Sequence, residues 1–301
     1  MIYNYFCLNM FVTQRFEVAM ITIPFIGYNL YQMFLIFCFW SFIGWGIEVV
    51  YMTIETGEFQ NRGFLNMPFC PIYGFGVLAV VAFTRPIAGS PLLLFVLSAV
   101  VCTALELLVG IGLEKIFHNI WWDYSHERFN YKGYICLKVT LLWGMGCLIV
   151  VKIVHPIVEK IINAIPFKVG IGFIITMSLL LIIDIISSVS DVENLNKYLR
   201  KIDEISKLMV ASSVMIGENL SNETLDLVEK YNHLVEQAAN AQGRLIRAFP
   251  YLKSSAYSNA METIKRKFFG DKKYESIADQ LEVRKKHIHV MHDDDDNDNE
   301  R

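Results

Sequence analysis

Four charged residues lie well inside the most apolar stretches of this 301-residue sequence, away from their ends: Glu48, Glu106, Lys138 and Asp184. A charge inside a bilayer costs about 2.5–3.5 kcal/mol on insertion scales, so each one needs a partner or a water-filled cavity. Carboxylates beside a lysine suit a substrate or ion pathway, but they equally suit buried ion pairs that fix how helices pack. The residue types alone leave both interpretations open.

Five apolar segments are candidates for crossing a membrane, which takes about 20 residues of helix. They are residues 30–54, 70–83, 92–113, 134–154 and 169–189, and the second is short enough to be tilted or partly re-entrant. The alternating direction of the spans brings all four charges toward one membrane face, here called the tail side. At about 1.5 Å per residue, they lie within roughly 6–11 Å of it. We therefore expect one polar site, in which Lys138 pairs with Glu48 or Glu106.

The composition divides the chain into a membrane part and a water-soluble part. Hydrophobic residues make up 54% and charged residues 19%, which excludes an ordinary soluble enzyme and a disordered chain. Residues 1–190 carry 10 basic and 10 acidic residues, whereas 191–301 carry 17 and 20. We predict an all-α polytopic membrane protein with about five transmembrane helices: a leader (1–29), a transmembrane domain (30–190), a soluble helical region (191–286) and a disordered His/Asp-rich tail (287–301). The net charge of −3 gives no basic surplus for nucleic acid.

Apolar residues in the soluble region recur every three or four positions, as on amphipathic helices. Stripes run over residues 195–209, 225–238 and 260–268, and the last precedes Gly270. This pattern favours a helical hairpin or coiled coil for self-association or partner docking. The tail side holds seven Lys/Arg in its short loops and near tail, against five on the other side. This bias favours a multi-pass cell-membrane protein with a cytoplasmic C-terminal region.

The first tail-side loop adds polar groups beside the intramembrane charges. Asn61 and Arg62 stand at its start, and Cys70 and Tyr73 flank a proline at its end. Arg62 offers a forked donor for carboxylate or phosphate, and the helix start has N–H groups that could face an anion; a plain turn before a helix is the alternative. Cys70 is a candidate nucleophile, but a small buried cysteine is the simpler interpretation because the sequence supplies no paired base.

The second tail-side loop is rich in aromatic residues. It contains Trp122, Asp123 and Tyr124, and later Asn130. An aromatic belt at the level of the lipid headgroups explains most of this composition. Alternatively, Asp123 lines the entrance to the polar site together with His118.

We expect neither a metal nor a cofactor. The six cysteines all lie in the apolar part without Cys-x-x-Cys spacing. The histidines and aspartates at 287–298 suit weak divalent-cation binding, but a solvated terminus is the simpler interpretation. The motif G-x-x-x-x-G-K-[ST] does not occur, so the chain cannot hydrolyse ATP by a P-loop mechanism.

Several residue blocks resemble, in this order, the family named Putative ABC-transporter type IV, whose members are bacterial integral membrane proteins named as ABC transporter permeases. The blocks are Gly44-Trp45 with Glu48, Asn61-Arg62-Gly63-Phe64-Leu65, Cys70-Pro71-Ile72-Tyr73-Gly74, Glu106, Trp121-Trp122-Asp123-Tyr124, and Phe129-Asn130 with Gly133. The resemblance covers residues 28–155, and residues 245–250 are similar as well. It implies a transport permease and brings no assigned substrate or catalytic residue.

Three functions remain open from the sequence. A permease-like transport component without its own ATPase is favoured by the resemblance and by the converging charges. It would work in the lipid bilayer with a separate ATPase subunit, as a homo-oligomer or a heteromeric complex, because five spans are few for a complete pore. An intramembrane enzyme or lipid-handling protein would use the same charges on lipid headgroups, although an enzyme is the less favoured interpretation. A membrane anchor would present the helical tail to partners. The candidate pathway residues are Glu48, Asn61, Arg62, Cys70, Tyr73, Glu106, Trp122, Asp123, Tyr124, Asn130, Lys138 and Asp184.

Overall fold

The computed structural model describes residues 23, 27–57, 59–87, 89–215, 222–271 and 274. These residues form two compact units. Unit 1 contains the described residues up to Leu105 together with Val139–Ile185, and unit 2 contains Glu106–Lys138 and the described residues from Ile186 onward. Most of the predicted leader and all of the predicted terminal tail lie outside the described residues.

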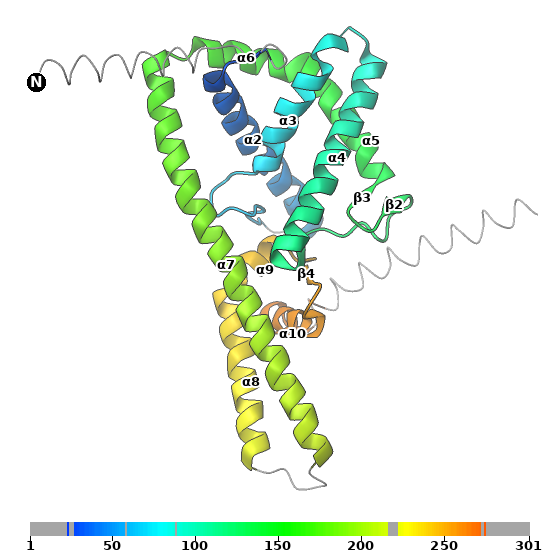
Figure 1. Cartoon of the computed structure of the whole chain (residues 1–301), viewed down its shortest axis with the longest axis vertical. Helices are drawn as coiled ribbons and strands as arrows, with labels where there is room; N and C mark the ends of the chain where they lie inside the picture. The colour runs from blue at the N-terminus through cyan, green and yellow to red at the C-terminus, as the bar shows by residue number, and fades with distance from the viewer. Residues whose placement is uncertain are drawn as a thin grey trace, which may run out of the picture. The chain divides into compact units, whose positions relative to one another are not determined.

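The helices of unit 1 begin and end at residues suited to those positions (Figure 1). Helix α2 (Leu30–Thr56) begins after Asn29, whose side chain forms a reciprocal capping box with Gln32, and it ends at Gly57 in the left-handed conformation. Helix α3 (Pro71–Thr84) begins with a proline, whose missing N–H would have no helical partner there. The chain continues through η1 (Arg85–Ile87), α4 (Pro91–Phe117), α5 (Leu137–Ile149), the π-helical turn η2 (Val150–Val154), α6 (His155–Ala164) and α7 (Phe167–Met215).

Four helices in the described part of the chain are long and apolar enough to cross a membrane. They are Leu30–Ile54, Pro91–Phe117, Leu137–Ala164 and Phe167–Ala211, while the apolar helix Pro71–Ile87 is shorter. The predicted all-α polytopic membrane fold is confirmed. The shorter helix is the segment that the sequence marked as tilted or partly re-entrant.

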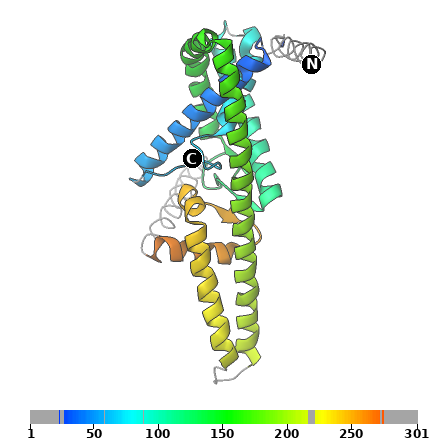
Figure 2. The same cartoon turned by 90° about the vertical axis from the view of Figure 1, so that its left-hand side faces the viewer.

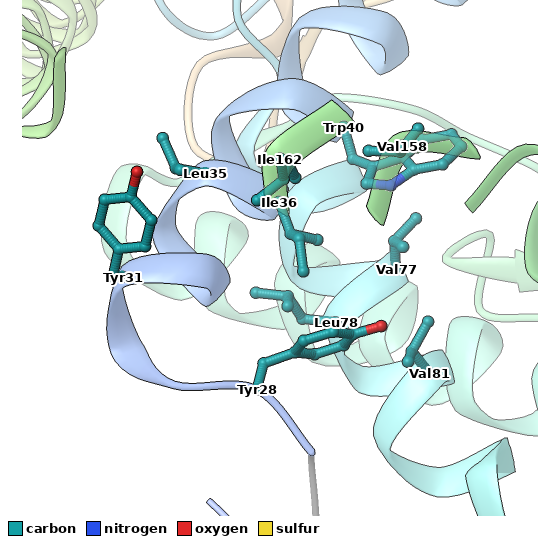
Figure 3. Packing of buried hydrophobic residues seen from close by; sticks show 10 residues of the cluster. All are labelled: Tyr28, Tyr31, Leu35, Ile36, Trp40, Val77, Leu78, Val81, Val158 and Ile162. Carbon is teal, nitrogen blue, oxygen red and sulfur yellow. The ribbon is translucent and has the colours of Figure 1, made fainter. Parts of the chain in front are cut away.

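One buried cluster of unit 1 joins α2, α3 and α6 (Figure 3). Its members are Tyr28, Tyr31, Leu35, Ile36 and Trp40 on or just before α2, Val77, Leu78 and Val81 on α3, and Val158 and Ile162 on α6. Gly74 lets α3 approach α2, because a Cβ there would overlap Ser41 and Phe37. This close packing fixes the helix that carries Glu48 against the helix that carries Tyr73.

Helix α7 differs from the prediction because it continues past the expected membrane boundary. The sequence suggested a span ending at 189 and a separate amphipathic helix in the soluble region, whereas the structure has one helix of 49 residues. No proline or glycine occurs between Gly172 and Met215, so nothing interrupts the backbone hydrogen bonding. The buried residues Val192, Leu195 and Leu199 therefore lie on the same helix as the last span.

The strands of unit 2 are short. Strand β1 (Asn119–Ile120) pairs antiparallel with β4 (Lys253–Ser254), and β2 (Asn130–Tyr131) pairs antiparallel with β3 (Ile135–Cys136). The fourth span was predicted to start at residue 134, but the chain first forms β3, and the helix begins at Leu137. Backbone pairing with β2 thus delays the helix, which apolar composition alone could not indicate.

The remaining elements of unit 2 are helices α8 (Asn222–Ala241), α9 (Gly243–Ala248) and α10 (Ser258–Phe269). Figures 1 and 2 both show α8 running beside the later part of α7, as expected for a helical hairpin. The apolar stripes of α8 and α10 supply buried residues, including Val235, Ala238 and Ile264. Helix α10 ends at Gly270, the position at which the sequence predicted it to stop.

Candidate functional site

In unit 1, Glu48 of α2 binds two side chains from the next segment of the chain. The Tyr73 hydroxyl donates a hydrogen bond to Oε1 at 2.7 Å, and Nε of Arg62 lies 3.2 Å from Oε2. Arg62 also contacts the sulfur of Met52 through Nη1. The side chains of Arg62 and Glu48 remain 20% and 28% exposed, so neither is sealed from its surroundings. We call Glu48, Arg62 and Tyr73 the Glu48 cluster.

Two packing features orient Tyr73. Gly44, one turn before Glu48, leaves the space that the tyrosine ring fills, because a Cβ at position 44 would overlap that ring. Trp143 of α5 packs edge-on against Tyr73 with ring centroids 5.5 Å apart. Gly44 therefore admits a ring of α3 next to the carboxylate.

The loop between α2 and α3 is held by side chains at both of its ends. Asn61 accepts a hydrogen bond from Nε1 of Trp45 at 2.6 Å and donates to the Asn66 carbonyl at 3.1 Å. Asp184 of α7, only 6% exposed, accepts the backbone N–H groups of Asn66 and Met67 at 3.0 and 2.9 Å. Asp184 therefore fixes the loop that presents the arginine of the Glu48 cluster.

Cys70 closes the same loop. Its thiol donates to the Arg62 carbonyl at 3.6 Å, and its backbone N–H donates to the Ser41 carbonyl at 2.9 Å. The residue is only 9% exposed. These contacts suit a small buried cysteine, which was the simpler of the two interpretations from the sequence.

In unit 2, the carboxylate of Glu106 is 6% exposed and accepts a hydrogen bond from the Tyr124 hydroxyl at 3.1 Å. One turn later on α4, Gly110 leaves room for two rings, because a Cβ there would lie 3.1 Å from both Trp122 and Tyr134. Trp122 in turn donates its indole N–H to the Tyr134 carbonyl at 2.9 Å. The aromatic loop thus packs over the face of α4 that carries Glu106.

The same loop is attached to the soluble region. Asp123 forms an ion pair with Lys253 of β4 and accepts the Ser125 backbone N–H at 2.9 Å. Burial raises the pKa of Asp123, but the hydrogen bonds from Lys253 and Ser125 outweigh it and hold the pKa below its usual value. Trp121, only 4% exposed, packs edge-on against Phe249 with centroids 4.8 Å apart. The aromatic loop thus contacts the soluble region. The sequence had suggested two other roles for this loop, an aromatic belt at the lipid headgroups or the entrance to the polar site.

The ion pair expected for Lys138 is not the one that the structure shows. Lys138 lies 3.0 Å from Glu127 and keeps 66% of its side chain exposed. Asn130 closes a neighbouring turn by donating to the Glu127 carbonyl at 2.8 Å. The structure brings six of the predicted residues together in unit 1, namely Glu48, Arg62 and Tyr73 with Asn61, Cys70 and Asp184 around them. The other six belong to unit 2: Glu106, Trp122, Asp123, Tyr124, Asn130 and Lys138.

A protein-family model with the description Putative ABC-transporter type IV matches residues 35–189. The chain belongs to this family. The matched stretch contains the Glu48 cluster, Glu106 and the aromatic loop, so the resemblance predicted from the sequence is confirmed. Neither a curated protein nor a solved structure is detectably similar to the chain. Family membership and the apolar helices together make this a multi-pass membrane protein related to transport.

Several contact residues of this family member were missed by sequence reasoning. Met52 and Trp45 lie four positions after and three before Glu48, so their helical spacing was a usable signal. Lys253 gave no such signal, because it lies 130 residues from its partner Asp123 and no pattern in one sequence relates the two.

No group of three or more His, Cys, Asp and Glu side chains suited to a metal ion occurs in the part of the chain that the structure describes. The predicted weak cation site among the histidines and aspartates at 287–298 lies outside the described residues.

Proposed function

We propose that this family member is a permease-like component of an ABC transporter, with the Glu48 cluster on its substrate or ion pathway. The observation that carries the proposal is the ion pair between Glu48 and Arg62 in unit 1. Charged groups in a membrane span are costly and usually face a bundle interior or a water-filled cavity. Both partners also remain partly exposed, which a pathway requires and a sealed structural ion pair does not.

The Glu48 cluster offers a substrate a replaceable charge partner. The Nε atom of Arg62 faces Glu48 and Nη1 contacts Met52, whereas no hydrogen bond or ion pair joins Nη2 to another described residue. An anionic group can therefore approach this nitrogen and compete with Glu48 for the guanidinium. Tyr73 would keep its hydrogen bond to Glu48 during the exchange. Glu48 then keeps one hydrogen-bond donor when the guanidinium turns to the anion, which lowers the cost of losing its charge partner.

Energy for transport would come from another subunit. The sequence has no P-loop motif, so a separate ATPase must bind and hydrolyse ATP. We place the C-terminal region and this partner in the cytoplasm, at the bacterial inner membrane, on the basis of the bias in Lys and Arg. The α7–α8 hairpin is our candidate for a coiled-coil docking element. A homo-oligomer or heteromeric complex would supply the additional spans of a complete pore.

Purification of the full-length protein from native membranes in mild detergent tests this proposal. Bound proteins and lipids are identified by mass spectrometry, and ATP hydrolysis by the recovered complex is measured. We expect an ATPase subunit to co-purify, and we expect Glu48→Gln and Arg62→Gln to alter its ATP hydrolysis. The matched control is Glu204→Gln on α7, an exposed carboxylate that pairs with Arg200 on its own helix. The control should leave hydrolysis unchanged.

Other outcomes would support the alternative functions. Recovery of no ATPase, under conditions that preserve a known permease complex, would contradict the proposal. A stoichiometric bound lipid that is lost in Arg62→Gln would instead favour a lipid-handling protein or enzyme. Normal function in Glu48→Gln, combined with loss of function when the exposed surface of α8 is altered, would favour a membrane anchor.

A further inference from the structure

A second polar cluster of unit 1 lies where α2 meets α6. His155, the first residue of α6, is 4% exposed, and both of its ring nitrogens are hydrogen-bonded. Trp40 of α2 donates its indole N–H to Nδ1 at 3.3 Å, and the Tyr28 hydroxyl lies 2.9 Å from Nε2. Trp40 and Tyr28 belong to the buried cluster shown in Figure 3. Trp40 precedes Glu48 by eight residues, or about 12 Å along the helix, so this cluster is separate from the Glu48 cluster.

The chemistry of tryptophan fixes the protonation state of the ring in this arrangement. An indole N–H is only a donor, so Nδ1 must be unprotonated in order to accept it. The proton of the neutral ring is then on Nε2, which donates to the Tyr28 oxygen. Burial, reinforced by the negative charge of Glu159 on α6, raises the pKa of Tyr28 to about 12. The tyrosine therefore stays protonated, and each group in the chain has a single role.

We propose that His155 is a proton-binding site, and that a proton bound at Nδ1 releases the start of α6 from Trp40. The site for the proton is the lone pair that accepts the indole N–H. Proton and indole therefore exclude each other, because two N–H donors would otherwise face one another. The step forms one N–H bond at Nδ1 with a proton from water and leaves the ring with one positive charge. No oxidant and no other reactant is needed.

Charged groups around His155 decide how the protonated ring is accommodated. Glu159, one helical turn later on α6, supplies a negative charge that acts on both the His155 ring and Tyr28. Arg85 of η1 supplies a positive charge on the side of Tyr28. Hydrophobic side chains of α3 and α7 pack on this cluster, namely Val77, Leu78, Val81, Phe167, Ile171 and Ile174. Glu159 is thus the counter-charge available to an imidazolium here.

The position of α6 in the chain determines what changes when His155 binds a proton. Helix α6 connects α5 to α7, and the turn immediately before His155 is the π-helical η2. Such π-turns often occur at functional sites and interrupt regular helical hydrogen bonding. Near the far end of α6, Asn163 accepts a hydrogen bond from Gln32 of α2 at 2.9 Å. Protonation therefore frees the start of α6, while this second bond keeps its end near α2.

Fluorine NMR of the full-length protein in lipid nanodiscs tests the inference. The protein is labelled with 5-fluorotryptophan, and the Trp40 resonance is assigned from its loss in Trp40→Phe. We expect this resonance to shift with a single proton-binding step between about pH 4.5 and 8, the range in which histidines titrate. The step should be absent in His155→Gln, which can accept the indole N–H but cannot bind the proton. It should persist in His233→Gln, which alters an exposed histidine of α8.

A second readout follows the helices directly. Cysteines replacing Gln32 and Asn163 remove the bond that holds the end of α6, so this end can then follow any movement of its start. The pair is cross-linked with a short reagent at each pH, and rates are compared with the same pair in His155→Gln to remove the pH dependence of the thiols. Acid should change the rate ratio only while His155 is present. A Trp40 resonance that does not titrate, or that titrates equally in His155→Gln, would overturn the proposal. If His155→Gln fails to fold, the same comparison is made with His155→Asn. Neither readout uses transport, so the result is independent of the proposed function.

Discussion

Replacing Asp184 by asparagine should loosen the loop that presents Arg62 while leaving the α7 helix intact. Asp184 accepts two consecutive backbone N–H groups, those of Asn66 and Met67, and it is only 6% exposed. An asparagine has the same shape but only one acceptor oxygen, and its amide NH₂ would face a backbone N–H. One of the two bonds is therefore lost, and the other loses its charge.

The size of the effect follows from the two bonds. A hydrogen bond to a charged group contributes about 1.5–3 kcal/mol, and a neutral one about 1 kcal/mol. Losing one charged bond and weakening the other should cost about 2–5 kcal/mol in the local opening of the loop. Since about 1.4 kcal/mol is a factor of ten, the two amides should exchange roughly 30- to 3,000-fold faster.

Hydrogen–deuterium exchange with peptide-level mass spectrometry over residues 61–69 measures this change. The matched control is Asp191→Asn on the same helix, where the carboxylate is 38% exposed and pairs with Arg244 at 3.5 Å. An exposed ion pair of this kind contributes about 0–1 kcal/mol, so its loss should leave the loop unchanged. Unchanged exchange in Asp184→Asn, or equal acceleration in both variants, would show that Asp184 does not hold the loop.

Further variants test the packing, the soluble region and the topology. Gly44→Ala should drive a Cβ into the Tyr73 ring, cost about 1–3 kcal/mol and lower the thermal unfolding midpoint in detergent, whereas Gly46→Ala meets open space and should not. Lys265→Met loses the bond from Nζ to the Pro250 carbonyl, but its stability relative to the wild type should be most favourable at and below about pH 7, because burial and then the charge of Lys253 lower the pKa of Lys265 to about 7. Between about pH 7 and the ordinary lysine pKa of about 10.4, the unfolded chain binds one more proton than the folded chain, so the stability of the wild type rises with pH. The stability of Lys265→Met relative to the wild type should therefore fall over this range. A difference that is constant with pH would contradict this prediction. In intact cells, a cysteine replacing Ala211 should be protected from an impermeant thiol reagent and one replacing Gly89 should react, and the reverse pattern would place the C-terminal region outside.

The helices were largely predictable because apolar length and helix-start residues are local signals. Pro71 and Pro91 stand at the first positions of α3 and α4, where a proline fits best. The end of the last span was not predictable from hydropathy, because α7 continues without a break into the soluble region. A change in polarity alters what a helix faces, but only a proline, a glycine or a cap ends its hydrogen bonding.

The site was only partly predictable because sequence fixes the depth of a residue better than its direction. Counting residues from the ends of the spans placed Glu48, Lys138 and Asp184 at a similar depth, but it could not show which way each helix is rotated about its axis. Asp184 turned out to bind backbone N–H groups rather than a charged side chain. The four-residue spacing of Gly44 and Glu48 is a more useful signal for a close neighbour beside the carboxylate, because it lies within one helix, where the geometry is known in advance.

The choice of Arg62 rather than Lys138 as the partner of Glu48 has a physical basis. Lys138 is the second residue of α5, and its flexible side chain reaches the surface, where it is 66% exposed and pairs with Glu127. A compact, strongly hydrated ammonium gains little by leaving water for a partly exposed carboxylate such as Glu48. Arg62 stands on a loop already fixed by Asp184, so its planar and more weakly hydrated guanidinium loses less conformational freedom on pairing. In sequence analysis, a lysine near a helix end should therefore be expected to reach solvent. The partner of an intramembrane carboxylate is better sought among arginines on ordered loops.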